Sequence, residues 1–183
     1  MRSLRFLLPV VLMTLCTVAL AQSDAQKSFD ELKTLAGVWK GTVTANPPQP
    51  DWDNKPVWAS LRVTSRGNAI VHEMKEPGTP DGMTHDDPIT MFYLDGDQLV
   101  LTHYCDAGNR PRMQARNSDG KVVEFDFVDV SGSTKPGNMY HAVFTAIDAN
   151  HHVEEWTYTM PGDKPMRARM ELHRKNTDSA KVW

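Results

Sequence analysis

The sequence predicts an all-β protein: an antiparallel up-and-down β-barrel of about ten strands, preceded by a short N-terminal helix. Three observations support this fold class. From Trp39 onward, apolar and polar residues alternate with the period of two that is typical of half-buried strands. Short turn sequences separate the alternating segments, which indicates antiparallel neighbours. No strand–helix–strand rhythm occurs, which argues against a parallel α/β fold.

Residues 1–21 predict a cleavable signal peptide. Arg2 and Arg5 precede an apolar segment over 6–20, and this segment is shorter than the ~20 apolar residues of a stable membrane anchor. The segment ends in a small-x-small pattern at Ala21, which signal peptidases recognise. We therefore expect cleavage before Gln22, a periplasmic or secreted protein, and no transmembrane anchor.

The two cysteines bear on anchoring and on redox chemistry. Cys16 raises the alternative of a lipoprotein, but Leu15 stands where a lipid-attachment site needs a small residue. Removal of the leader leaves Cys105 alone, so no intramolecular disulfide can form and the core must stabilise the domain. Cys105 is then either a buried apolar side chain or a functional thiol.

The chain that remains after cleavage suits a single domain. We divide it into a disordered linker over 22–27, a barrel domain over 28–176 and a C-terminal tail over 177–183. The leader holds two of the 20 basic residues and none of the 23 acidic ones, so the mature chain has a net charge of −5. A mildly acidic chain without a long basic stretch argues against nucleic acid as a partner.

The N-terminal helix is expected to start at Ser28. Ser28 and Glu31 match the capping box, in which the Ser hydroxyl caps the first turn and the Glu carboxylate bonds to the Ser amide. One face of the helix is apolar and consists of Phe29, Leu32 and Leu35. Gly37 is expected to end the helix.

Ten segments show the alternation of a strand. They are 39–45, 57–65, 68–76, 89–94, 98–105, 112–117, 122–130, 139–147, 152–160 and 166–174. A closed barrel and a sandwich both fit this series, and the consecutive hairpins favour the barrel because closure removes exposed sheet edges. The irregular stretches 46–55 and 77–87 are expected to be loops at the barrel rim.

The sequence Gly37-Val-Trp39, after a short helix, resembles the first strand of the calycins, which include lipocalin and nitrobindin-like barrels. The chain looks most like exported bacterial members of that group. In calycins the Trp closes the barrel floor and an Arg of the last strand packs on it. Arg174 is in phase with the inward residues of the last strand, so the resemblance gives structural roles to Gly37, Trp39 and Arg174. It also implies a small hydrophobic ligand inside the barrel.

The resemblance is incomplete in two respects. The lipocalin disulfide is absent, and no strong match to the heme-binding residues of nitrobindins occurs. Heme is therefore not carried over as a cofactor, and we expect no resident cofactor and no metal.

Candidate ligand-binding residues follow from strand phase. His103 and Cys105 share the phase of Leu99 and Leu101, and two further histidines lie in phase with apolar neighbours on their own strands. The polar hairpin over 102–113 adds a basic side chain at the rim. The candidate set is His72, His103, Cys105, Arg112, His141 and Tyr158.

The sequence predicts ligand binding in preference to catalysis, because it lacks the Gly-x-Ser-x-Gly, phosphate-loop and His-Glu-x-x-His motifs. We expect an envelope protein that holds an apolar or amphipathic small molecule in the barrel. One alternative is a heme- or metal-dependent activity that uses His72, His103 and His141. Another is a partner-binding module that uses Trp52, Trp58 or Trp183 on its surface. Aromatic side chains that filled the barrel solidly, among them Phe125, Phe127, Trp156 and Tyr158, would argue against a ligand cavity.

Overall fold

The structure is a computed structural model that describes residues 22–75, 78–79, 88–116, 120–160, 162 and 164–175. It consists of one helix, a 3-10 turn and ten strands: α1 (Asp24–Thr34), β1 (Gly37–Asn46), β2 (Pro56–Thr64), η1 (Ser65–Gly67), β3 (Ala69–Met74), β4 (Ile89–Asp95), β5 (Gln98–Tyr104), β6 (Asn109–Ala115), β7 (Val122–Gly132), β8 (Asn138–Asp148), β9 (His151–Met160) and β10 (Lys164–Arg174). The expected leader over 1–21 and the whole of the expected tail over 177–183 lie outside the described residues.

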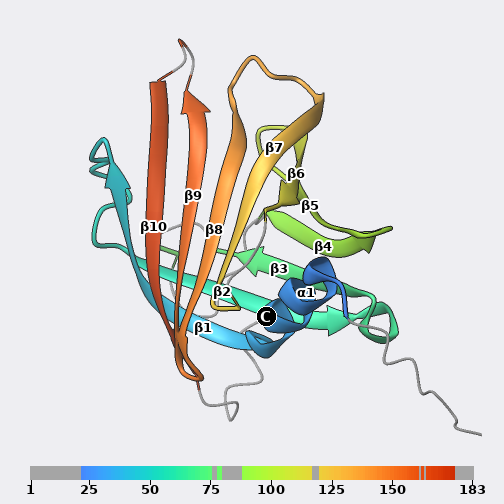
Figure 1. The fold of residues 1–183 in the computed structure, drawn as a ribbon. Helices are drawn as coiled ribbons and strands as arrows, with labels where there is room; N and C mark the ends of the chain where they lie inside the picture. The colour runs from blue at the N-terminus through green and yellow to red at the C-terminus, as the bar shows by residue number, and fades with distance from the viewer. Residues whose placement is uncertain are drawn as a thin grey trace, which may run out of the picture.

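The ten strands form a closed antiparallel barrel, which confirms the predicted fold class (Figure 1). Each strand pairs with its neighbours in sequence, and β10 pairs with β1 to close the barrel. The closing register places Trp39 opposite Arg174 and Val43 opposite Met170. The predicted strands agree with these ten, and the largest shift at a strand start is in β6, which begins at Asn109.

Helix α1 begins earlier than the sequence predicts. The side chain of Ser23 caps it by accepting a hydrogen bond from the Gln26 amide at 3.2 Å, whereas Ser28 lies inside the helix and is buried. Asp24 in the first turn favours this start, because a carboxylate is stabilised at a helix N-terminus and here also pairs with Lys27 at 2.9 Å. Residues 24–27, expected to be a disordered linker, therefore form the first helical turn.

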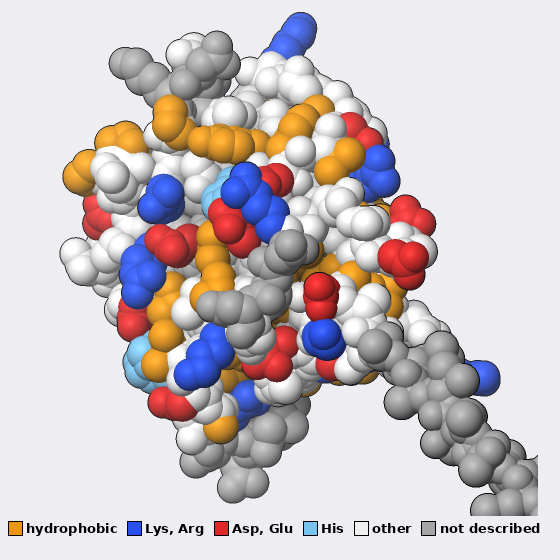
Figure 2. All heavy atoms as spheres, in the orientation of Figure 1, with side chains coloured by type: hydrophobic (Ala, Val, Ile, Leu, Met, Phe, Trp, Pro, Cys, Tyr) orange, Lys and Arg blue, Asp and Glu red, His pale blue; other side chains and the backbone are white. Residues whose placement is uncertain are grey.

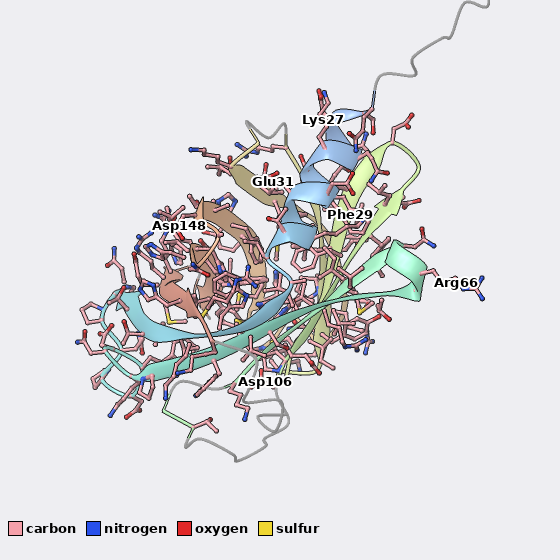
Figure 3. All side chains as sticks on the ribbon, turned by 90° about the horizontal axis from the view of Figure 1, so that it is seen from below. Lys27, Phe29, Glu31, Arg66, Asp106 and Asp148 are labelled. Atoms are coloured by element: carbon pink, nitrogen blue, oxygen red, sulfur yellow. The ribbon has the colours of Figure 1, made fainter. Side chains whose placement is uncertain are left out.

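The helix packs across one end of the barrel, against β2, β4 and β5 (Figure 3). Phe29 and Leu32 on its apolar face are buried in the same core as Trp39. We call this the helix end. The opposite end carries the loops after β1, β3, β5 and β7, and we call it the loop end.

The interior is filled with aromatic side chains over part of its length. Phe92, Phe125 and Phe144 are fully buried and lie 5.3–6.2 Å apart between ring centroids. Trp156 lies 5.5 Å from Phe144. Phe127, in contrast, is exposed, so the aromatic side chains do not fill the barrel completely.

None of the helices in the described part of the chain is long and apolar enough to cross a membrane.

Candidate functional site: a cavity at the loop end

A cavity of about 470 Å³ lies between the loop end and the filled part of the interior. Strands β1, β2, β3, β5, β8, β9 and β10 and the loops after β1, β3, β5 and β7 contribute to its lining. Its apolar side chains include four methionines, and the apolar residues are Val43, Trp52, Val57, Met74, Pro88, Pro136, Met139, Trp156, Met166, Ala168 and Met170. This size and lining match those of small-molecule sites, which span about 300–1,000 Å³.

His103 is the buried imidazole in this cavity. It is 1% exposed, its Nδ1 lies 2.8 Å from Thr90 Oγ1, and its ring centroid lies 5.4 Å from that of Trp156. Burial lowers the pKa of His103 to about 4, with a further lowering from His72 and an opposing effect from Asp106. The ring is therefore neutral near pH 7, and Nε2 is the ring nitrogen left for a ligand.

Cys105 and Tyr158 also line the cavity, as the strand phase predicts. The Cys105 thiol donates to Asp106 Oδ1 at 3.3 Å. Burial raises the pKa of this thiol to about 11, so it stays protonated and is a poor nucleophile near pH 7. The Tyr158 hydroxyl donates to the Pro136 carbonyl at 2.6 Å.

A fully buried carboxylate, that of Glu154 on β9, lies close to the cavity. It accepts from Trp156 Nε1 at 3.1 Å and from His152 Nε2 at 2.9 Å, and both of its oxygens lie within 3.2 Å of His72 Nε2. Burial alone would raise the pKa of Glu154, but the two imidazoles outweigh that effect and hold it below its ordinary value. Glu154 is therefore ionised, and His72 is engaged by it and does not line the cavity.

The sequence reasoning missed Glu154, although a signal for it existed. Alternate residues of β9 share a face, and Trp156 was assigned to the interior, so His152 and Glu154 belong to the same inward set. Thr90 and Lys75 were also missed. Both are buried, and Lys75 lines the cavity and interacts with the surrounding protein.

Besides His72, two further predicted site residues, Arg112 and His141, lie outside the cavity. Arg112 is half-buried and pairs with Asp129 at 2.6 Å on the outer face, because the inward residues of β6 are its neighbours Pro111 and Met113. His141 is displaced by a β-bulge: Met139 pairs with Tyr158 and His141 with Thr157, which leaves Tyr140 as the extra residue. The bulge reverses the phase of β8, so Met139 points inward while His141 does not.

His141 instead lies beside two carboxylates of β7. Its Nδ1 is 3.1 Å from Asp126 Oδ1 and its Nε2 is 3.4 Å from Glu124 Oε1. The ligand atoms of these three residues lie within 4.8 Å of one another, a spacing that could hold a metal ion. Arg116 pairs with both carboxylates, however, so the group already forms an ion-pair network on the outer surface.

The three histidines therefore do not converge. His103 lines the cavity, His72 is bound to Glu154, and His141 is on the outer surface. Of the tryptophans considered for partner binding, Trp58 is buried and Trp52 lines the cavity, while Trp183 lies outside the described residues.

The helix end contains the residues that the calycin resemblance singles out. The guanidinium of Arg174 lies 4.1 Å from the ring centroid of Trp39 and donates to the carbonyls of Ala36 at 2.6 Å and Thr34 at 3.1 Å. Trp39 Nε1 donates to the Leu35 carbonyl at 2.8 Å. These contacts join the end of α1 to the first and last strands.

Comparison with known proteins finds similarity to solved structures. No family model and no curated protein matches this chain. Among solved structures, Rv2717c from M. tuberculosis is similar, with a TM-score of 0.58 and 13% identity over 81% of this chain and 98% of that one. At this identity the similarity concerns the fold alone, and the chain is thus an antiparallel barrel with the architecture that Rv2717c also has.

Proposed function

We propose that this protein binds a small, largely apolar molecule in the cavity at the loop end of its barrel. The observation that carries the proposal is the cavity itself: about 470 Å³, lined mainly by apolar side chains and containing one buried neutral imidazole. An apolar cavity with few polar groups is the usual form of a small-molecule site. The resemblance to calycins, which bind hydrophobic ligands inside the barrel, supports the same function.

A fluorescence titration with the neutral probe N-phenyl-1-naphthylamine tests the proposal. We expect saturable binding to the wild-type protein and at least tenfold weaker binding to Ala168→Phe, because Ala168 faces the cavity and a larger side chain would fill it. The control is Thr44→Phe, which adds the same side chain on the exposed outer face of β1. Absence of saturable binding, or equal binding by the two variants, would contradict the proposal.

A heme-dependent activity is the second candidate, with one histidine in the cavity in place of the three that the sequence predicts. His103 offers the cavity one imidazole nitrogen, whereas His72 and His141 are held by carboxylates. A hemin titration separates the two functions: a Soret band that forms with the wild-type protein and is lost in His103→Leu would favour the heme-dependent activity. An unchanged hemin spectrum would exclude heme binding and favour the binding of an apolar ligand.

We further propose that the protein acts outside the cytoplasm after removal of residues 1–21. The basic start, the short apolar segment and the small residues before Gln22 support this location. N-terminal sequencing of the protein from a cell-envelope fraction of its own host should find Gln22 first. Native mass spectrometry of the same material would give the mass of a retained ligand.

A further inference from the structure

The contact between His103 and Thr90 determines which ring nitrogen of His103 carries the proton. Thr90 is fully buried, and in the described part of the chain the hydrogen-bond partner of its hydroxyl is His103 Nδ1, at 2.8 Å. If Nδ1 carried the proton, the hydroxyl hydrogen of Thr90 would have no acceptor, which buried polar groups avoid. The hydroxyl therefore donates to Nδ1, and the neutral ring carries its proton on Nε2.

His103 consequently offers the cavity a hydrogen-bond donor. Nδ1 is occupied by Thr90, and the ring lines the cavity, so the Nε2–H group is the part of the imidazole that a ligand can meet. A donor in an apolar site selects ligands with an acceptor, because a ligand that leaves the donor unpaired loses the hydrogen bond that water would have provided.

The charges around the cavity favour a neutral ligand. The carboxylates of Asp51 and Asp106 line it and disfavour an anion. Desolvation of the buried imidazole of His103, which lowers its pKa, also disfavours a cation in the interior. Lys75 supplies a positive group, but it already interacts with the protein around it.

The remaining lining favours a flat, polarisable ligand. Trp156 and Trp52 offer aromatic rings, and the thioethers of Met139 and Met170 lie in the same cavity. Aromatic rings pack against one another, and thioethers contact aromatic groups favourably and adapt to their shape.

Resting on the proposed function, we infer that the cavity selects neutral, flat aromatic molecules that carry a carbonyl oxygen, and that this oxygen accepts a hydrogen bond from the Nε2–H group of His103. Thr90 is then a positioning residue, which holds the imidazole in the tautomer that donates.

Calorimetric titration with three matched compounds tests the ligand class. Fluorene and 9-fluorenone differ by a carbonyl, and fluorene-9-carboxylate adds a negative charge. We expect the wild-type protein to bind 9-fluorenone about five- to tenfold more tightly than fluorene, as one buried hydrogen bond provides. The carboxylate should bind more weakly than the ketone.

Three variants assign the preference to His103. His103→Leu should bind fluorene and 9-fluorenone equally, whereas His103→Gln, whose amide N–H replaces the imidazole N–H, should keep a preference for the ketone. Arg112→Gln, outside the cavity, is the control and should match the wild-type protein. A ketone preference that survives in His103→Leu would overturn the inference.

The outcomes separate this inference from the function on which it rests. Saturable binding of fluorene without a preference for the ketone overturns the inference and leaves the proposed function intact. Failure of both fluorene and 9-fluorenone to bind overturns both.

The tautomer has its own test, which needs no ligand. Long-range ¹H–¹⁵N NMR spectra at pH 7 should show His103 with a protonated Nε2 and an unprotonated Nδ1. Thr90→Val removes the hydroxyl that donates to Nδ1, so the ketone preference of that folded variant should shrink. A protonated Nδ1 in the wild-type protein would overturn the assignment.

Discussion

At the scale of single residues, the interior holds two titratable groups, His103 and Glu154, that both contact Trp156, one neutral and one ionised. His103 is neutral because burial lowers its pKa to about 4. Glu154 is ionised because His72 and His152 outweigh the effect of its burial. Both states depend on the interior, since neither group would show such a shift in water.

The pH dependence of stability follows from the His103 pKa. Between the ordinary pKa of 6.5 and the folded value of about 4, the unfolded chain binds a proton that the folded protein does not. The free energy of unfolding should therefore fall as the pH drops through this range, by up to about 3 kcal/mol. Urea unfolding of the wild-type protein and of His103→Gln at a series of pH values measures this fall. The variant should lose the part of the pH dependence that His103 contributes. A wild-type slope that the variant retains in full would contradict the shift.

Replacement of the buried carboxylate should destabilise the protein. In Glu154→Gln an amide NH₂ group would face the N–H donors of His72, His152 and Trp156, so we expect a loss of about 2–4 kcal/mol in the free energy of unfolding. The control is Glu155→Gln, since Glu155 is the next residue of β9, points outward and pairs loosely with Arg167 at 3.8 Å. Denaturant midpoints compare the two variants. Similar losses of stability would argue against Glu154 as a buried acceptor for these three N–H donors.

At the scale of elements, one residue of β10 connects three parts of the chain. Arg174 packs on Trp39 of β1, donates to the last carbonyls after α1, and donates to the Ala149 carbonyl between β8 and β9 at 2.7 Å. Gly37 permits this arrangement, because a Cβ at that position would collide with the Arg174 guanidinium. Its φ of +147° also favours glycine.

Gly37→Ala should therefore loosen the junction of α1, β1 and β10. We expect it to lower the free energy of unfolding by about 2–4 kcal/mol, because it adds both a collision and backbone strain. Gly96→Ala is the control, since Gly96 has a φ of +60° but open space where a Cβ would lie. Thermal unfolding compares them, and equal losses would show that the approach of Arg174 does not matter. Amide exchange of α1 should accelerate only in Gly37→Ala.

At the scale of the whole molecule, the two ends of the barrel have different roles. The helix end is closed by Phe29, Leu32 and Trp39, all nearly or fully buried, whereas the loop end contains the cavity. The outer surface carries interspersed acidic and basic side chains, as Figure 2 shows for one face. The interior, rather than a single-sign surface patch, is therefore the feature that the candidate site depends on.

This division predicts that stability and binding respond to different substitutions. Phe29→Ala leaves a hole at the helix end and should cost about 3–5 kcal/mol in the free energy of unfolding. It should leave the affinity of the folded protein for N-phenyl-1-naphthylamine unchanged, because Phe29 does not line the cavity. Ala168→Phe should instead weaken probe binding and leave the free energy of unfolding nearly unchanged. Chemical denaturation and probe titration on both variants check this, and a Phe29→Ala variant that folds but loses the probe would contradict it.

Strand phase predicted most of the barrel correctly, because alternation is a local property. The inward phase of β5 identified His103 and Cys105 as cavity residues, and the phase of β10 identified Arg174 as the partner of Trp39. The predicted start of the helix was wrong, because Ser23 and Ser28 both carry a hydroxyl that can cap a helix. The packing of the next turns decides which of the two serines is the N-cap.

By itself, then, the sequence determined the all-β class, the strand count and the inward faces, since each of these is set by residues a few positions apart. Only the tertiary structure decided the contents of the cavity. The bulge at Tyr140 removed His141 from the interior, and the approach of β3 to β9 joined His72 to Glu154 across 82 positions of the chain. Contacts between distant strands depend on barrel closure, and no local pattern in the sequence encodes where closure brings two side chains together.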